Sequence, residues 1–159
     1  METPSHGPTG TIGTLKILVG ALLMGLITAT GVMFMLVQQG IHQPQPGLES
    51  LLLVLAILWP VTAGASLLIK GAMVKQARTR WEAEGGSGDD NALFPHFMSM
   101  TIVRAALLEG PGLFGAVTYL MTGKPLALIA PALSIAALGL MFPTEEKFRE
   151  LVRSVTGKL

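Results

Sequence analysis

Four apolar stretches of about membrane length constrain this chain more than any other feature of its sequence. They cover residues 17–37, 48–69, 97–122 and 126–142. A helix rises about 1.5 Å per residue and the hydrocarbon core of a bilayer is about 30 Å thick, so about 20 apolar residues make one span. A helix also satisfies its own backbone hydrogen bonds in lipid. The sequence therefore predicts an all-α, polytopic membrane protein with four transmembrane helices, arranged as two hairpins.

Composition supports a membrane protein and argues against several other classes. Half of the residues are hydrophobic and only 13% are charged, whereas soluble domains carry about a quarter charged residues. The net charge of +1 gives no basic excess for a nucleic-acid partner. There is no cysteine, and the three histidines are isolated, so we expect no metal site and no cofactor.

The sequence also offers no arrangement of residues that predicts an enzyme. Residues 110–115 (GPGLFG) match the G-x-G-x-x-G pattern of dinucleotide sites, but they lie inside an apolar helix with no strand before them. No Ser/His/Asp constellation can be placed in the membrane. We therefore expect a membrane protein without enzymatic activity, whose surroundings are the lipid bilayer and other membrane subunits or further copies of itself.

The polar segments are predicted to lie outside the bilayer. Residues 1–13 are rich in Pro, Gly and Thr and are expected to form a flexible tail. Residues 75–95 are expected to form a cytoplasmic loop. Residues 144–156 carry Phe148 and Leu151 at helical spacing among charged residues, which predicts an amphipathic helix lying on the membrane surface. A solvated tail is the alternative for this last segment.

Basic residues gather after the second apolar stretch and in the C-terminal segment, while the loop at 38–47 has none. The positive-inside rule then places both termini in the cytoplasm. A prokaryotic inner (plasma) membrane is the expected location. The basic segment at 70–80 either binds anionic lipid or simply fixes the topology. The residues predicted to anchor the protein at the lipid interface are Arg104, Lys75, Arg78, Arg80, Lys147, Arg149 and Arg153.

An internal repeat relates the two halves of the chain. When Ile17 is aligned with Ile102, residues 21–25 (ALLMG) lie over residues 106–110 (ALLEG). A second alignment places the proline of the second apolar stretch over the proline of the fourth. The repeat predicts two hairpins in parallel orientation, with a glutamate in the third helix where the first helix has a methionine.

Glu109 is the feature within the spans that most suggests function. Starting the third helix after the Gly-Pro-Gly would leave too few residues to span, so Glu109 is predicted to lie inside the membrane. An ionisable residue there is costly and is by default a functional hypothesis. Its helical neighbours are mostly small, which favours packing against another helix. Thr28, Thr62 and Ser134 fall at similar depth and are its predicted hydrogen-bond partners.

Two features flank the glutamate on the third helix. Gly110, Pro111 and Gly112 follow it, and a proline with neighbouring glycines predicts a kink. Arg104 precedes it by about 140° around the helix. The arginine is therefore expected to extend to the cytoplasmic interface instead of pairing with Glu109.

Residues 70–119 show a local resemblance to the hairpin of ATP synthase proteolipids, the c-subunits. The features in common are small residues on the first helix, the basic residues at 75–80, and the sequence ALLE at residues 106–109 followed by Phe114-Gly115. The resemblance implies that Glu109 binds an ion. It covers about a third of the chain, the connecting segment is longer than in that family, and no family is assigned from it.

The sequence leaves two candidate functions for this protein. The first is an accessory or structural subunit packed into a larger membrane complex, in which Glu109 makes a hydrogen bond between helices. The alternative is a proton- or cation-translocating subunit that works through Glu109.

Overall fold

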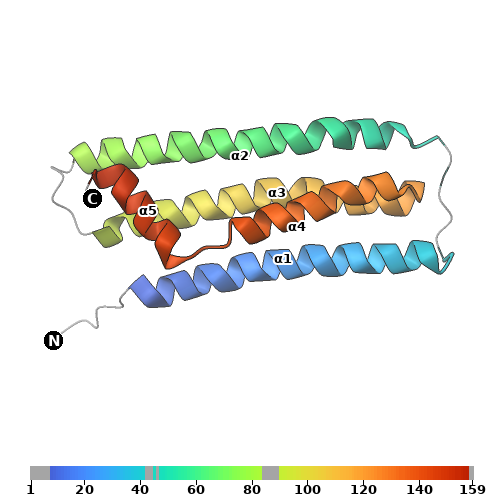
Figure 1. Ribbon diagram of the computed structural model, residues 1–159, viewed down its shortest axis with the longest axis horizontal. Helices are drawn as coiled ribbons and strands as arrows, with labels where there is room; N and C mark the ends of the chain where they lie inside the picture. Colours follow the sequence, from blue (N-terminus) through green and yellow to red (C-terminus); the bar gives the residue numbers. More distant parts are fainter. Residues whose placement is uncertain (1–7, 42–44, 46, 84–89, 158–159) are drawn as a thin grey trace.

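The computed structural model describes residues 8–41, 45, 47–83 and 90–157 (Figure 1). The described residues form helices and connections and contain no strand, which confirms the all-α prediction. The helices are α1 (Pro8–Gln38), α2 (Ser50–Ala83), η1 (Asp90–Leu93), α3 (Phe94–Thr122), η2 (Pro125–Leu128), α4 (Ile129–Leu140) and α5 (Glu145–Thr156), where η marks a short 3-10 helix.

Three of these helices, α1, α2 and α3, are each long and apolar enough to cross a membrane. The fourth predicted span, 126–142, corresponds to η2 and α4, which together extend only about 24 Å at 1.5 Å per residue. They qualify as a span only together with α5, and the axis bends by 73° between the two parts. The described chain therefore has three membrane-length helices, or four spans if the bent pair counts as one.

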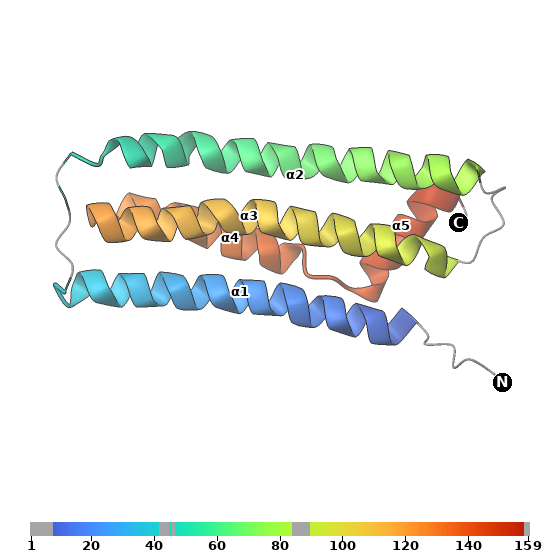
Figure 2. The same cartoon turned by 180° about the vertical axis from the view of Figure 1, so that it is seen from behind.

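α3 is the central helix of the bundle. α1 lies along one side of it, α2 along the other, and α4 covers one of its faces (Figures 1 and 2). In its most apolar stretch, α3 has 44% of its residues buried inside the protein. The corresponding stretches of α1 and α2 each have only 11% buried. α1 and α2 share little direct packing. The predicted pair of packed hairpins is therefore not confirmed, because α3 fills the space between the first two helices.

Two glycines of α3 allow α4 to approach closely. A Cβ on Gly115 would lie 2.7 Å from Cδ of Pro131 and 2.9 Å from the carbonyl oxygen of Ala127. A Cβ on Gly112 would lie 2.8 Å from Cβ of Ser134. Real side chains essentially never approach so closely, so only glycine fits at either place. In lipid, where apolar side chains gain little by leaving the solvent, close contact of this kind is a main source of helix association.

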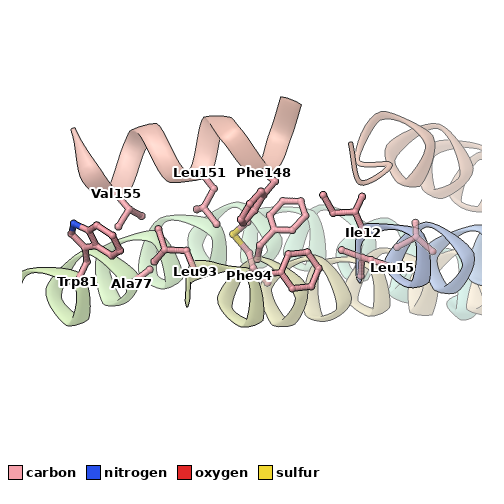
Figure 3. Packing of buried hydrophobic residues seen from close by; sticks show 12 residues of the cluster. Ile12, Leu15, Ala77, Trp81, Leu93, Phe94, Phe148, Leu151 and Val155 are labelled. Atoms are coloured by element: carbon pink, nitrogen blue, oxygen red, sulfur yellow. The ribbon is translucent and has the colours of Figure 1, made fainter. Parts of the chain in front are cut away.

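At the end of the bundle where α4 stops, α5 bends away from the α4 axis by 73° and packs across α2 and α3 (Figure 3). Phe148, Leu151 and Val155 are buried on its inner face. The ring of Phe148 lies 5.6 Å from that of Phe94 and 5.5 Å from that of Phe97, both nearly edge-on. We call this cluster the cap; its buried members are Ile12, Leu15, Val19, Ala77, Trp81, Leu93, Phe94, Phe97, Met100, Phe148, Leu151 and Val155.

The cap changes the interpretation of the C-terminal segment. A helix over 144–156 was expected, and α5 occupies nearly the same residues, with Thr144 as its N-cap. Its apolar face, however, packs on the protein's own helices and is not free to enter lipid. The spacing of apolar residues predicts that one face of the helix is buried. It does not predict whether that face is buried in lipid or against protein.

Two segments predicted to be irregular are helical instead. In the predicted tail 1–13, α1 already begins at Pro8, a residue suited to the first turn of a helix; residues 1–7 lie outside the described residues. In the predicted loop 75–95, α2 continues to Ala83, and residues 84–89 lie outside the described residues. Packing in the cap explains both extensions, since Ile12 and Trp81 are buried there.

An ion pair ties together the two connections at the opposite end of the bundle. The Lys124 amine donates to the Glu49 carboxylate, and this hydrogen bond and the lysine charge hold the pKa of Glu49 below its ordinary value. Both side chains are largely exposed, so the pair contributes little to stability. Gly123 ends α3 in the left-handed conformation at φ 65°, which glycine adopts without strain.

Candidate functional site

Basic residues at one level of the bundle indicate where the hydrocarbon core ends. Counting about 20 residues along each long helix from the end away from the cap reaches the neighbourhood of Lys16 on α1, Lys70 on α2 and Arg104 on α3. By this count we expect most of the cap to lie outside the hydrocarbon and Glu109 to lie within it, about 8 Å from the arginine level at 1.5 Å per residue. Glu109 thus lies on the cap side of the membrane centre, about midway between the centre and the arginine level.

The Glu109 side chain is half-buried on α3. Ala105 and Leu113, one turn away in each direction, belong to a cluster with Leu22 and Leu26 of α1. Among the described residues, no hydrogen bond or ion pair reaches the Glu109 carboxylate. An ionisable group is therefore held in apolar surroundings without a partner.

The structure does not assemble the predicted polar cluster around Glu109. Thr28 is exposed. The Thr62 hydroxyl donates to carbonyl oxygens of its own helix, Leu58 at 2.9 Å and Trp59 at 3.0 Å. No hydrogen bond among the described residues joins either threonine to Glu109.

Ser134 is fully buried, but its partner is a residue that the sequence analysis missed. The indole Nε1 of Trp59 donates to the Ser134 hydroxyl oxygen at 3.2 Å and links α2 to α4. A tryptophan within a membrane span needs a hydrogen-bond acceptor for its indole N–H. The presence of Trp59 in the second apolar stretch could therefore have predicted a polar partner on a neighbouring helix.

The three residues that follow Glu109 differ in burial. α3 continues through Gly110, Pro111 and Gly112 without a break (Figure 2). Pro111 and Gly112 are buried, whereas Gly110 is exposed and a Cβ there would meet nothing within 4 Å. The kink stays a prediction, and the glycine at 112 is explained by its close contact with α4.

Two of the predicted anchoring residues make contacts inside the protein. The Arg104 Nε donates to the hydroxyl oxygen of buried Ser66 at 3.2 Å. The Lys147 amine donates to the carbonyl oxygens of Leu140 and, at 2.9 Å, Phe142. These are acceptors that the end of α4 leaves without an intrahelical donor, so Lys147 caps that helix.

The other five predicted anchors are exposed, and their anchoring at the lipid interface stays a prediction. They are Lys75, Arg78, Arg80, Arg149 and Arg153. Arg78 pairs with Glu82 at 2.9 Å, Arg149 lies 4.0 Å from Glu145, and Arg80 lies 3.3 Å from a ring nitrogen of His96.

The fold defines an all-helical protein whose long apolar helices fit a membrane. The described residues contain no group of three or more His, Asp or Glu side chains that could hold a metal ion. Comparisons with protein-family models, with characterised proteins and with solved structures find no match to this chain. The resemblance to the ATP synthase proteolipids therefore stays a prediction.

Proposed function

We propose that this protein is a structural or accessory subunit that packs into a larger membrane assembly. One observation carries the proposal: the central helix α3 has an uncovered face lined with small residues. α4 covers one face of α3, and the opposite face lies open between α1 and α2 (Figure 2).

Small residues mark the middle of this open face. Ala106 and Gly110 are exposed on it, with Val103 and Val117 at its two ends. These residues follow one another at helical spacing, so they form a continuous strip along α3. Small residues let a neighbouring backbone come close, which is the usual basis of helix association in membranes. The exposed parts of α1 and α2 border the strip and offer further apolar contact.

Replacing Gly110 with leucine tests the open face. We expect the variant to keep the monomer fold, because a side chain there meets nothing within the protein. We expect the wild type to form a higher-mass assembly after mild solubilisation and the variant to lose it, because leucine keeps a partner helix away from α3. Native gel electrophoresis and native mass spectrometry measure the assembly and show whether the partner is a second copy or another subunit.

Gly139 of α4 provides a matched control. It is also an exposed helical glycine with open space around it, but it lies on the outer helix. The leucine variant there should assemble normally. A wild-type protein that stays monomeric under the mildest conditions, or equal effects of the two variants, would contradict the proposal.

The alternative function is translocation of a proton or a cation through Glu109. Its supporting observation is the isolation of this carboxyl group, which lies at a half-buried site among apolar side chains and has no partner among the described residues. A group in such surroundings can exchange a proton or a cation without first breaking an ion pair.

Replacing Glu109 with glutamine distinguishes the two functions, because glutamine keeps the shape and the capacity for hydrogen bonding but cannot ionise. If Glu109 carries ions, we expect flux through reconstituted proteoliposomes, followed with a pH- or ion-sensitive dye, to fall to the background level while assembly is unchanged. Glu146, exposed on α5, is a control position for the same substitution. Unchanged flux in the Glu109→Gln variant, or no flux in the wild type, would exclude translocation by this residue.

A further inference from the structure

A cavity of about 570 Å³ lies where the membrane part of the bundle meets the cap. α2 and α3 form one side of it, and the end of α4 and α5 form the other. Its apolar lining includes Leu67, Met100 and Leu140, and its polar lining includes the hydroxyls of Thr101 and Ser154.

Three cationic side chains converge on this cavity from three different helices. They are Lys70 of α2, Arg104 of α3 and Lys147 of α5. Among the described residues that line this cavity, Glu150 is the only one with a carboxylate. The lining therefore carries a positive excess in a chain whose net charge is only +1.

The three cations are close enough to affect one another. Burial lowers the pKa of the Lys147 amine below its ordinary value; Arg104 and Lys70 lower it further, and Glu150 partly offsets them by raising it. Like charges held together without matching counter-charge are unfavourable, and an anion placed among them removes the repulsion.

The cations also keep donors available for a ligand. Among the described residues, the Arg104 guanidinium uses one N–H, for Ser66, and the Lys147 amine donates to two carbonyl oxygens at the end of α4. These contacts fix both groups in place. The side chain of Lys70 is exposed at the rim and has no hydrogen-bond partner in the described part of the chain. Fixed arginine and lysine donors around a common space are the usual recognition groups for phosphate.

We propose that this cavity binds a phosphate group, held by Lys70, Arg104 and Lys147. Two sources supply such a group: the headgroup of an anionic phospholipid and free phosphate. The position of the cavity favours the lipid, because Arg104 lies near the level where the hydrocarbon core ends. The apolar lining beside the cations also suits the start of an acyl chain.

The test measures thermal stabilisation of the purified protein in a zwitterionic detergent as a ligand is added. Three ligands are compared at equal ionic strength: short-chain phosphatidylglycerol, short-chain phosphatidylcholine and inorganic phosphate. We expect saturable stabilisation by phosphatidylglycerol and little by phosphatidylcholine, whose choline adds a positive charge. If inorganic phosphate stabilises to the same extent, the source of the group is soluble phosphate.

Variants connect the response to the cavity. Lys70→Gln and Arg104→Gln should each weaken apparent affinity by about tenfold, as expected for losing one charge-assisted hydrogen bond. Glu150→Gln should strengthen it, because it removes the opposing charge. Lys75→Gln, on α2 but outside the cavity lining, should have no effect. The proposal is overturned if no phosphate-bearing ligand stabilises the protein, or if Lys70→Gln and Lys75→Gln behave alike.

Discussion

Replacing Gly115 with valine is expected to separate α4 from α3. The first side-chain carbon alone would lie within 3 Å of the Pro131 ring, of the Ala127 carbonyl oxygen and of the Ala130 Cβ. None of these atoms can move away by a side-chain rotation, so α4 itself must shift. Overpacking costs about 1–3 kcal/mol in well-packed proteins, and we expect the upper part of that range here because the neighbours are rigid. Thermal unfolding in lipid nanodiscs, followed by circular dichroism, measures the loss.

Gly110→Val is the matched control for this prediction. It places the same β-branched side chain on the same helix, five residues earlier, with the same change in intrinsic helix propensity. Its Cβ meets nothing within 4 Å, so the monomer should keep its stability. Equal destabilisation by the two substitutions would show that the close contact between α3 and α4 does not hold the bundle together.

The membrane part of the fold was predictable because it depends on length and hydrophobicity. The apolar stretches at 17–37 and 97–122 lie within long helices, and the stretch at 48–69 does so from residue 50 onward. The fourth stretch was less informative: α4 ends at Leu140, whose carbonyl oxygen accepts a hydrogen bond from the Lys147 amine, and the chain then bends into α5. The donor to this carbonyl oxygen is a side chain of the next helix. The spacing of apolar residues in the fourth stretch does not reveal this interaction.

The candidate site was only partly predictable. Glu109 stands out in any reading of the sequence, since it is an ionisable residue within an apolar stretch. Its predicted partners were chosen by depth alone, and depth does not say which way a side chain points around a helix. Thr28 therefore proved to be exposed, while Ser134 is buried against Trp59. The cationic cavity joins residues of α2, α3 and α5, and only the packing of these helices reveals it.

Phe148→Ala is expected to release α5 from the rest of the protein. Most of the cap lies beyond the level of Arg104, where we expect contact with water, so the hydrophobic effect should drive its packing as in a soluble core. Phe148 is only 7% exposed, and its ring packs edge-on against those of Phe94 and Phe97. Truncating a buried phenylalanine to alanine costs about 3–5 kcal/mol. Hydrogen exchange of the α5 backbone should then be faster by a factor of about 10² to 10³, since 1.4 kcal/mol corresponds to tenfold.

Two further variants show whether protein or lipid holds α5. Phe148→Leu keeps most of the apolar volume and should retain most of the protection. Phe94→Ala changes only the partner ring on α3, so it should also accelerate exchange in α5 if the two helices pack on each other. If α5 instead lay with its apolar face in the membrane surface, Phe94→Ala would leave α5 unchanged, and protection would depend on the lipid composition. The response of α5 to a substitution in α3 therefore decides between the cap and a surface helix.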